Sequence, residues 1–198
     1  MSYRSIMGLE NKDIDPPSPK MKPRFRGERA VIRPPCDQEG LAVHRLIARC
    51  EPLDGNSTYC NLLQCSHFAN TCAVAVEPWS GVLRAFLSAY LIPKRSDTLF
   101  VWQVAVAPEA RGEGLAKRMI LDVLRRPTCR NIRFLEASIT SGNQASWNLF
   151  FSIARELEAA HRTEPLFEAG RHFENTHETE TLLRIGPFGQ RVAEKKGT

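Results

Sequence analysis

Residues 99–116 read LFVWQVAVAPEARGEGLA, and this stretch decides the fold. Its first eight residues, 99–106, are apolar except for Gln103, which is typical of a strand buried on both faces of a sheet. Pro108 ends that strand, and a segment with two glycines follows. Apolar residues then recur at helical spacing through Arg126, namely Leu115, Met119, Ile120, Val123 and Leu124. The stretch therefore predicts a buried strand, a glycine loop and an amphipathic helix in direct succession.

The predicted loop has the composition of an anion-binding site. The first N–H groups of a helix lack partners within the helix and carry the positive end of its dipole, so they bind phosphate. Gly112 and Gly114 have no Cβ, which lets the loop take positive φ and close on a ligand, and Arg111 adds a fixed positive charge. The alternative is an ordinary glycine turn before a helix, which leaves Arg111 and the second glycine unexplained.

Length and composition indicate one globular domain. The chain has 198 residues, 42% of them hydrophobic and 25% charged. Residues 1–27 contain several prolines and no periodicity, so we expect a disordered leader, followed by the domain at 28–187 and a flexible tail at 188–198. No apolar run is long enough to span a membrane and no secretory signal is seen, which predicts a cytoplasmic protein without a membrane partner.

The cysteines and the net charge give no sign of a metal or of nucleic acid. The six cysteines form no CxxC and have no histidine at ligand spacing, so we expect reduced thiols, several of them buried on apolar faces, with Cys72 in a strand and Cys50 and Cys60 on helices. The net charge of +5 is concentrated toward the two ends, and no basic face with interleaved aromatic residues is seen. Attraction of an anionic coenzyme explains the charge at least as well.

The remaining elements follow from periodicity and turn residues. We expect a strand at 30–33, a helix capped by Asp37, a second helix capped by Ser57, a hairpin of 71–76 with 82–92, and a turn at 93–97. After the glycine-loop helix we expect a strand at 132–139 parallel to the central one, a helix starting from Ser141, an irregular stretch at 158–176 and a last strand at 179–185. The apolar positions expected on the three other helices are Leu41, Leu46, Ile47 and Cys50 as one stripe, then Tyr59, Leu62, Leu63 and Phe68, and then Ala145, Leu149, Ile153 and Leu157 as another stripe.

The pattern Arg-x-x-Gly-x-Ala at 111–116 resembles the acyl-CoA pyrophosphate loop of the GNAT superfamily of N-acetyltransferases, and the order of elements matches that fold throughout. The resemblance implies an α/β fold with a mixed central sheet flanked by helices, and acetyl-CoA as the co-substrate. The positions that it assigns to the coenzyme are Val104, Ala105, Val106, Arg111, Gly112, Glu113, Gly114, Leu115, Ala116, Asn143 and Ser146. For Asn143 and Ser146 the alternative is a helix cap.

Three further stretches sharpen the resemblance: PLDGNSTY at 52–59, DTLFVWQV at 97–104, and HETE at 177–180 shortly before LRIGP at 183–187. Together with ARGEGLA and FLEA they resemble the L-2,4-diaminobutyrate acetyltransferases of ectoine synthesis, over residues 32–187. Ala85 and Ala89 depart from that pattern, where glycine is common. The resemblance implies acetylation of the γ-amino group of L-2,4-diaminobutyrate, a role in osmotic stress and a homodimer.

A small diamino acid needs acidic partners, a donor for its carboxylate and an aromatic wall. Asp54 and Glu180 can supply the acids, Tyr59 the hydroxyl donor and Trp102 the wall, while His177 can orient Glu180. Each residue also has a structural alternative. Asp54 can form an Asx turn, Tyr59 and Trp102 can pack in the core, and Glu180 can face solvent.

In the mechanism that follows, the amine attacks the thioester directly, and positioning supplies much of the acceleration. Glu180 would remove the proton, Asp54 would hold the second ammonium, and the backbone N–H near Val104 would meet the charge on the carbonyl oxygen. Many relatives carry a proton-donating tyrosine where this chain has Phe150 and Phe151, so the sequence names no acid. Acetylation of another small amine or of a protein N-terminus remains an alternative, as does a binding module without catalysis.

Overall fold

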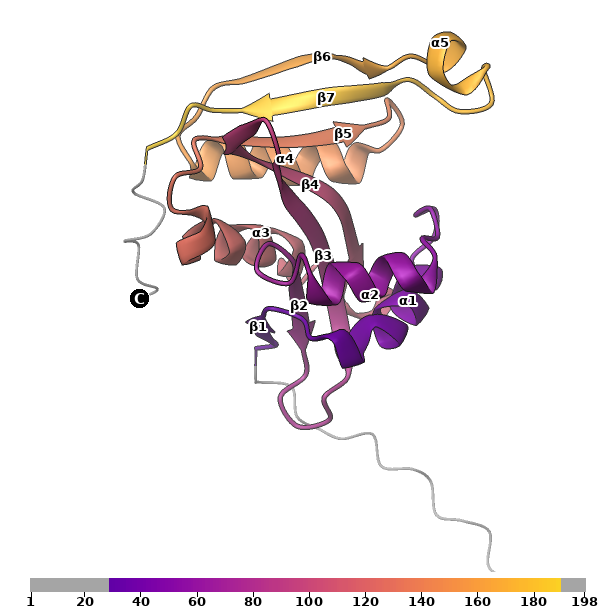
Figure 1. Ribbon diagram of the computed structural model, residues 1–198, viewed down its shortest axis with the longest axis vertical. Helices are drawn as coiled ribbons and strands as arrows, with labels where there is room; N and C mark the ends of the chain where they lie inside the picture. Colours follow the sequence, from indigo (N-terminus) through magenta and orange to yellow (C-terminus); the bar gives the residue numbers. More distant parts are fainter. Residues whose placement is uncertain (1–28, 190–198) are drawn as a thin grey trace, which may run out of the picture.

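The computed structural model describes residues 29–189, so the predicted leader and residues 190–198 of the predicted tail lie outside the described residues. Seven strands form one sheet in the order β1-β2-β3-β4-β5-β7-β6 (Figure 1). The strands are β1 (Val31–Arg33), β2 (Ala73–Val76), β3 (Leu83–Ile92), β4 (Arg95–Val106), β5 (Phe134–Ile139), β6 (His161–Phe167) and β7 (Glu180–Ile185). The α-helices are α1 (Gly40–Ala48), α2 (Thr58–Ser66), α3 (Leu115–Arg125), α4 (Gln144–Glu156) and α5 (Ala169–Phe173).

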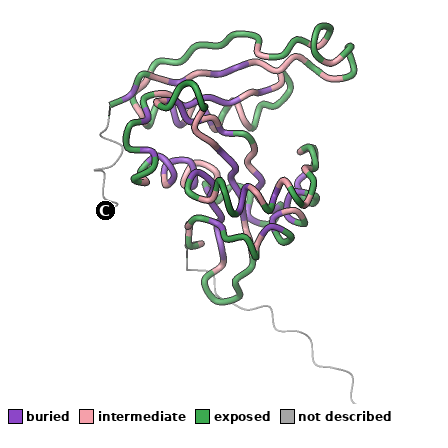
Figure 2. The backbone as a smooth tube through the Cα atoms, in the orientation of Figure 1, coloured by how far each residue is buried: buried purple, intermediate pink, exposed green. Residues whose placement is uncertain are grey.

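The sheet is mixed, as predicted. Neighbouring strands are antiparallel except for β4 and β5, which run parallel and are joined through α3. The predicted stripe on α3 is buried at every position, and the helix packs on β2, β3 and β4. Figure 2 shows the buried part of the backbone following these strands and the inner side of α3. The succession of strand, glycine loop and helix is therefore confirmed.

The pairing of β4 with β5 ends at Val101 and Ala137, although both strands continue beyond these residues. Figure 1 shows the two strands diverging from there, and we call this point the strand fork. Residues 102–106 of β4 therefore have no strand partner on the side of β5 within the described part of the chain. Their backbone N–H and C=O groups on that side are left for other partners.

A β-bulge lies in β4 at the strand fork. Val101 lies opposite Ala89 of β3 and Gln103 lies opposite Ser88, so Trp102 has no partner residue on β3. A bulge bends a strand and increases its twist, which turns the end of β4 away from β5. The expectation that the strand is buried on both faces is wrong at Trp102, which is 51% exposed.

Two boundaries differ from the sequence-based expectations. The central strand begins at Arg95, because the hairpin turn comprises only Pro93 and Lys94 instead of 93–97. The stretch 158–176 is not irregular, since it forms β6 and α5. β6 is an exposed edge strand, so it needs no alternation of apolar and polar residues, and that absence concealed it from sequence reasoning.

The helix starts also differ in detail. Asp37 begins a 3-10 turn in front of α1 instead of capping the helix, and its carboxylate accepts a bond from the N–H of Gln38 at 2.8 Å. Ser57 does cap α2, by accepting from the N–H of Cys60 at 3.1 Å. The cap of α4 is Asn143, two residues beyond the predicted Ser141.

The predicted stripes hold only in part. Their exposed members are Leu41, Tyr59, Leu62, Phe68 and Ala145. The buried positions of α2 are Asn61, Gln64 and Cys65, because α2 contacts α1 partly through polar groups: the Asn61 amide bonds His44 at 3.2 Å and Gln64 at 2.9 Å.

Four of the six cysteines and Phe188 belong to the described core. All six thiols are free, and Cys50, Cys65, Cys72 and Cys129 are buried, whereas Cys60 is half-buried and Cys36 is exposed. Cys50 follows α1 instead of lying on it, and Cys72 directly precedes β2. Phe188, the first residue of the predicted tail, packs on the core. No helix within residues 29–189 combines the length and the apolar character needed to span a bilayer.

A buried carboxylate ties three strands together on the paired side of the strand fork. Glu136 of β5 is 1% exposed and accepts two hydrogen bonds from Arg95 of β4, at 2.6 and 2.9 Å. Arg184 of β7 donates to the same carboxylate, and its guanidinium lies 3.7 Å from the ring centroid of Phe134. Hydrogen-bonded charges of opposite sign compensate for the loss of hydration at such a site.

We expect Glu136→Gln to lower the free energy of unfolding by roughly 3 kcal/mol, because two guanidinium groups then lose a shared, buried partner. Urea unfolding of both proteins measures the difference. Glu164→Gln on the exposed edge strand is the matched control and should stay within about 0.5 kcal/mol of the wild type. Equal stability of the two variants would contradict this role of Glu136.

Candidate active site

The glycine loop has the conformation that its composition predicts. A 3-10 turn at Pro108–Ala110 follows β4, and Gly112 and Gly114 take φ angles of +84° and +72°. A Cβ at either glycine would meet open space, so the backbone conformation itself requires glycine there. Gly114 starts α3 without a side-chain cap, which leaves the first N–H groups of the helix without a side-chain acceptor. The loop therefore presents unpaired amide donors at the positive end of a helix.

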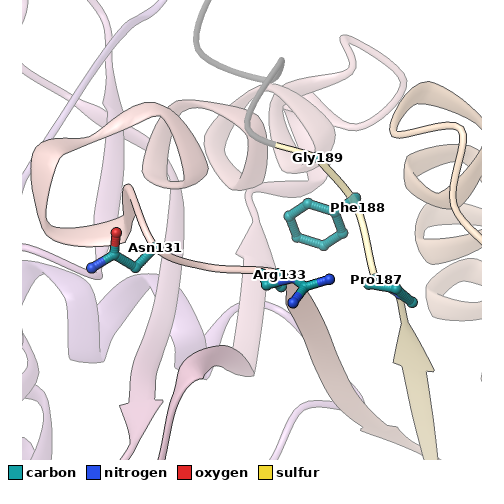
Figure 3. Close-up of a pocket in the computed structure, with 5 residues that line it drawn as sticks. All are labelled: Asn131, Arg133, Pro187, Phe188 and Gly189. Atoms are coloured by element: carbon teal, nitrogen blue, oxygen red, sulfur yellow. The ribbon is translucent and has the colours of Figure 1, made fainter.

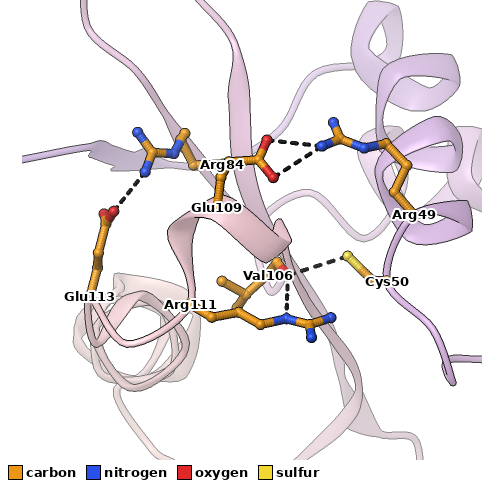
Figure 4. Close-up of polar contacts among 7 residues, drawn as sticks. All are labelled: Arg49, Cys50, Arg84, Val106, Glu109, Arg111 and Glu113. Atoms are coloured by element: carbon orange, nitrogen blue, oxygen red, sulfur yellow. Dashed lines mark hydrogen bonds and ion pairs between the residues drawn. The ribbon is translucent and has the colours of Figure 1, made fainter.

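Arg111 extends from this loop toward the end of β4. Its Nε donates to the carbonyl oxygen of Val106 at 3.5 Å, and the Cys50 thiol donates to the same oxygen at 3.4 Å (Figure 4). Burial raises the pKa of the Cys50 thiol, and the guanidinium of Arg111 acts in the opposite direction. The Arg111 guanidinium thus lies where β4 enters the loop.

Val104, Ala105 and Val106 lie on the edge of β4 that has no partner beyond the strand fork. Val104 and Val106 are half-buried, and Ala105 is buried. The backbone groups of these residues directly precede the loop, so one continuous edge of polar backbone leads from the fork to the start of α3. This arrangement brings the predicted coenzyme positions of β4 and of the loop together.

The start of α4 lies near the C-terminal end of β5, beyond the strand fork. Trp147 donates to the carbonyl oxygen of Thr140 at 3.2 Å, which anchors the first turn of α4 to the end of β5. The Asn143 side chain accepts from the N–H of Ser146 at 3.0 Å, so it caps α4, as the alternative interpretation had it. The cap leaves the amide NH₂ of Asn143 without a hydrogen bond within the described residues.

The loop between α1 and α2 is fixed to β4 by Gln103. Its Nε2 donates to the backbone oxygen of Asp54 at 2.8 Å, and its Oε1 accepts from the side chain of Asn56 at 3.0 Å. Sequence reasoning missed this role, although Gln103 was visible as the lone polar residue in an apolar strand. The two bonds hold the Asp54 loop beside the strand edge that leads to the coenzyme loop.

The structure excludes three of the alternatives for the predicted substrate residues. The carboxylate of Asp54 is exposed and makes no hydrogen bond within residues 29–189, so it forms no Asx turn. Tyr59 is 70% exposed in the first turn of α2. Trp102 is half exposed and meets Tyr90 edge-on, with ring centroids 6.5 Å apart. Neither aromatic side chain belongs to the core, and all three remain free for a ligand.

Glu180 and His177 lie across the strand fork from the Asp54 loop. Thr181 pairs with Ile139, which puts Glu180 at the end of β5. The Glu180 side chain is 19% exposed, and its Oε1 lies 3.9 Å from Nε2 of His177. The partial burial and this contact argue against a carboxylate that merely faces solvent.

The ring of His177 is held by groups that the sequence did not indicate. Its Nδ1 lies 2.8 Å from the backbone oxygen of Glu178, and Phe173 of α5 stacks on the ring at 4.8 Å between centroids. The Glu178 carboxylate accepts a bond from Ser141 at 3.0 Å. The first two contacts hold the ring with Nε2 at 3.9 Å from the Glu180 carboxylate, which is beyond hydrogen-bond distance. Phe173 gave no signal because it lies in the stretch expected to be irregular.

A hollow lined by Asn131, Arg133, Pro187, Phe188 and Gly189 lies elsewhere in the molecule (Figure 3). Arg133 precedes β5, so this hollow is at the opposite end of that strand from Glu180. None of the predicted site residues lines it. Within residues 29–189 no group of His, Cys, Asp and Glu side chains is arranged to hold a metal ion.

The comparison of sequences identifies the class of protein. Residues 41–151 match the acetyltransferase (GNAT) family. The matched segment begins in α1, includes the Asp54 loop, the strand fork and the glycine loop, and ends in α4. The chain therefore belongs to the acetyltransferase (GNAT) family.

Relatives within that family narrow the assignment. The chain is 49% identical to the L-2,4-diaminobutyric acid acetyltransferase of Methylotuvimicrobium alcaliphilum, over 80% of this chain and 91% of the relative. It is 46% identical to the enzyme of the same name from Bordetella parapertussis, over 79% and 84% of the two chains. The structure resembles diaminobutyrate acetyltransferase EctA from Paenibacillus lautus, solved with L-2,4-diaminobutyric acid and coenzyme A. The TM-score is 0.78 at 36% identity, covering 82% of this chain and 98% of the other. The chain is thus a member of the L-2,4-diaminobutyric acid acetyltransferase branch.

We expect Gln103→Leu to increase cleavage by endoproteinase Asp-N in front of Asp54 by about tenfold, because two hydrogen bonds that hold the loop are lost. Mass spectrometry of the fragments measures the rate at this bond. Gln144→Leu is the control, since Gln144 is an exposed glutamine whose side chain bonds only Asn148. Unchanged cleavage in the Gln103 variant would show that the loop does not depend on these bonds.

Proposed function

We propose that this chain transfers the acetyl group of acetyl-CoA to the γ-amino group of L-2,4-diaminobutyrate and gives N-γ-acetyl-diaminobutyrate, a step of ectoine synthesis under osmotic stress. One observation carries the proposal. Gln103 bonds the backbone oxygen of Asp54 and so holds this loop beside the strand edge that leads to the glycine loop, while the Asp54 carboxylate has no hydrogen-bond partner within residues 29–189. The similarity to the Paenibacillus lautus enzyme, solved with this diamino acid and coenzyme A, supports the same substrates here.

The coenzyme fits the donor side of the site. The unpaired amides around Gly112 and Gly114, with the charge of Arg111, suit a diphosphate, and the edge of β4 at 104–106 suits the extended arm that carries the thioester. Backbone N–H groups of residues 113–116 are the proposed diphosphate donors, including those of Glu113, Leu115 and Ala116. Asn143 and Ser146 would contact the same molecule from the start of α4. When bound, acetyl-CoA supplies an activated acetyl thioester.

The acceptor side fits a short diamino acid. Asp54 would pair with the α-ammonium group, and the hydroxyl of Tyr59 would donate to the carboxylate. Trp102 offers an exposed aromatic face to the cationic substrate. Glu180, on the other side of the strand fork, would accept a proton from the γ-ammonium group and leave the amine with a free electron pair. His177 would hold Glu180 in position for that transfer.

Most of the acceleration would come from holding the amine and the thioester side by side, with no covalent enzyme intermediate. The N–H of Val104 would donate to the carbonyl oxygen as negative charge develops there. Phe150 is buried, and Phe151 stacks between Trp147 and His161, at 5.6 and 5.0 Å. Neither phenylalanine side chain carries an exchangeable proton. The attacking nitrogen holds one excess proton in the tetrahedral state, and we assign the transfer of that proton to the leaving thiolate to a water molecule as the C–S bond breaks.

We further propose that the protein acts in the cytoplasm as a homodimer. Exposed apolar side chains on the neighbouring helices α1 and α2 and in the turn after α2 support self-association: Leu41, Leu62 and Phe68 are between 38% and 46% exposed. Light scattering of the purified protein during gel filtration tests this state. A monomer mass at all accessible concentrations would contradict it.

The central test follows free thiol release when the purified chain is mixed with acetyl-CoA and a diamine. We expect turnover with L-2,4-diaminobutyrate and at least about a hundredfold lower kcat/KM with putrescine, which lacks the carboxylate and places its amines differently. NMR of the product should locate the acetyl group on the γ nitrogen. Thiol release that is as fast with putrescine would point to another small amine, and acetyl-CoA binding without thiol release would point to a non-catalytic module.

Glu180→Gln should lower kcat by roughly 100-fold or more with a smaller effect on KM, because the proton acceptor is lost while the shape is kept. Glu178→Gln is the matched control two residues away, since its carboxylate bonds Ser141 instead of pointing to His177. Steady-state kinetics of the three proteins decides the question. Equal kcat values for both variants would remove Glu180 from the mechanism.

A further inference from the structure

The loop that is expected to bind the diphosphate carries negative charges of its own. Residues 108–116 contain Glu109 and Glu113 against a single arginine, Arg111, so the loop alone has one net negative charge. Glu113 lies between the two glycines, next to the amides that face the ligand. A carboxylate at this place repels a diphosphate and works against the amide donors. The structure shows how each acid is balanced, and Figure 4 draws these contacts.

Arg84 balances Glu113 from the neighbouring strand β3. Its Nη2 donates to the Glu113 carboxylate at 2.7 Å, and Glu77 lies farther away, at 3.9 Å from Nη1. The backbone oxygen of Arg84 accepts from the N–H of Ala107, at 2.9 Å, which fixes its position against the entry of the loop. The Arg84 side chain is only 22% exposed, so solvent screens this pair less than an ordinary surface pair.

Arg49 neutralises Glu109 in the same way, but this pair is more exposed to solvent. Its Nη2 donates to both carboxylate oxygens, at 2.9 and 3.0 Å. The pKa of the Glu109 carboxyl is lowered, first by a hydrogen bond with its own backbone and second by the hydrogen bond from Arg49. Both side chains are more than half exposed, so water and salt weaken the interaction. Of the two pairs, Arg84–Glu113 therefore changes the electrostatic potential at the loop more than Arg49–Glu109 does.

The two nearby cations of α3, Lys117 and Arg118, contact other groups instead of the loop carboxylates. Lys117 lies 3.3 Å from the Glu156 carboxylate and 3.3 Å from the backbone oxygen of Ser152, and Arg118 donates to the backbone oxygen of Ala30 at 3.0 Å. The balance at the loop itself therefore depends on Arg49, which directly follows α1, and on Arg84 of β3. With both pairs formed, the net negative charge of the loop is removed even when Glu77 beside Arg84 is counted.

We propose that Arg84 is a positioning residue for coenzyme binding, which acts by neutralising Glu113 and drawing its carboxylate away from the diphosphate site. The proposal rests on the proposed use of acetyl-CoA and extends it to a residue outside the glycine loop. Arg84 touches no substrate in this role. Its effect is felt only by ligands that carry a diphosphate.

Titration calorimetry with coenzyme A tests the proposal on four proteins: wild type, Arg84→Gln, Glu113→Gln and the double variant. We expect Arg84→Gln to weaken binding about three- to tenfold at low salt, because an unopposed carboxylate faces the diphosphate. Glu113→Gln keeps the backbone N–H assigned to the diphosphate and removes the repelling carboxylate, so it should bind more tightly than the wild type. The double variant should return to within about twofold of the wild type, and 0.5 M KCl should shrink the differences.

An acetyl donor without the diphosphate distinguishes an electrostatic effect of Arg84→Gln from damage to the fold. S-acetylpantetheine lacks the diphosphate, so kcat/KM with this donor should be the same for the wild type and Arg84→Gln. Arg49→Gln is the matched control at the exposed pair and should weaken coenzyme A binding less than twofold. Failure of the double variant to recover, or an equal loss with S-acetylpantetheine, would overturn the role of Arg84 alone. Absence of coenzyme A binding to the wild type would overturn the proposed function as well.

Discussion

Backbone hydrogen bonding between β4 and β5 ends after Val101 and Ala137, and every proposed role in the site depends on that separation. A continued ladder would occupy the N–H and C=O groups of residues 102–106, and no strand edge would remain for a ligand. The bulge at Trp102 bends β4 at the same place and turns an aromatic side chain outward. One irregularity in a single strand thus lies at the open edge and also exposes the aromatic side chain that is proposed as one wall of the site.

An opened sheet has to be held on both sides of the opening. On the paired side, Glu136 joins β4, β5 and β7 through Arg95 and Arg184, so the strands stay together up to the strand fork. On the open side, Gln103 replaces the missing strand contact with two bonds to the Asp54 loop. Both sets of contacts place polar side chains within a sheet, and such side chains are stable there when they have hydrogen-bond partners.

The sequence was informative where a single periodicity decides the structure. Residues 99–116 predicted the strand, the glycine loop and α3, because burial on one helix face and the need for positive φ both leave direct marks in the sequence. The edge strand β6 escaped detection, since solvent on its exposed side imposes no alternation. The bulge at Trp102 also left no local mark, because it arises from the register between β3 and β4, which depends on contacts distant in the sequence.

At the site, the structure decides between interpretations that the sequence left open. Tyr59 and Trp102 have core alternatives in the sequence, yet the structure exposes both, and the Asp54 carboxylate has no hydrogen-bond partner within residues 29–189. Exposed aromatic surface costs hydrophobic free energy, on the order of 25 cal/mol per Å², that the fold does not recover by itself. A ligand that covers the rings and pairs with the carboxylate would recover it. Trp102 therefore departs from the burial expected of its strand at the place where binding is proposed, as expected when a site is built at the expense of the core.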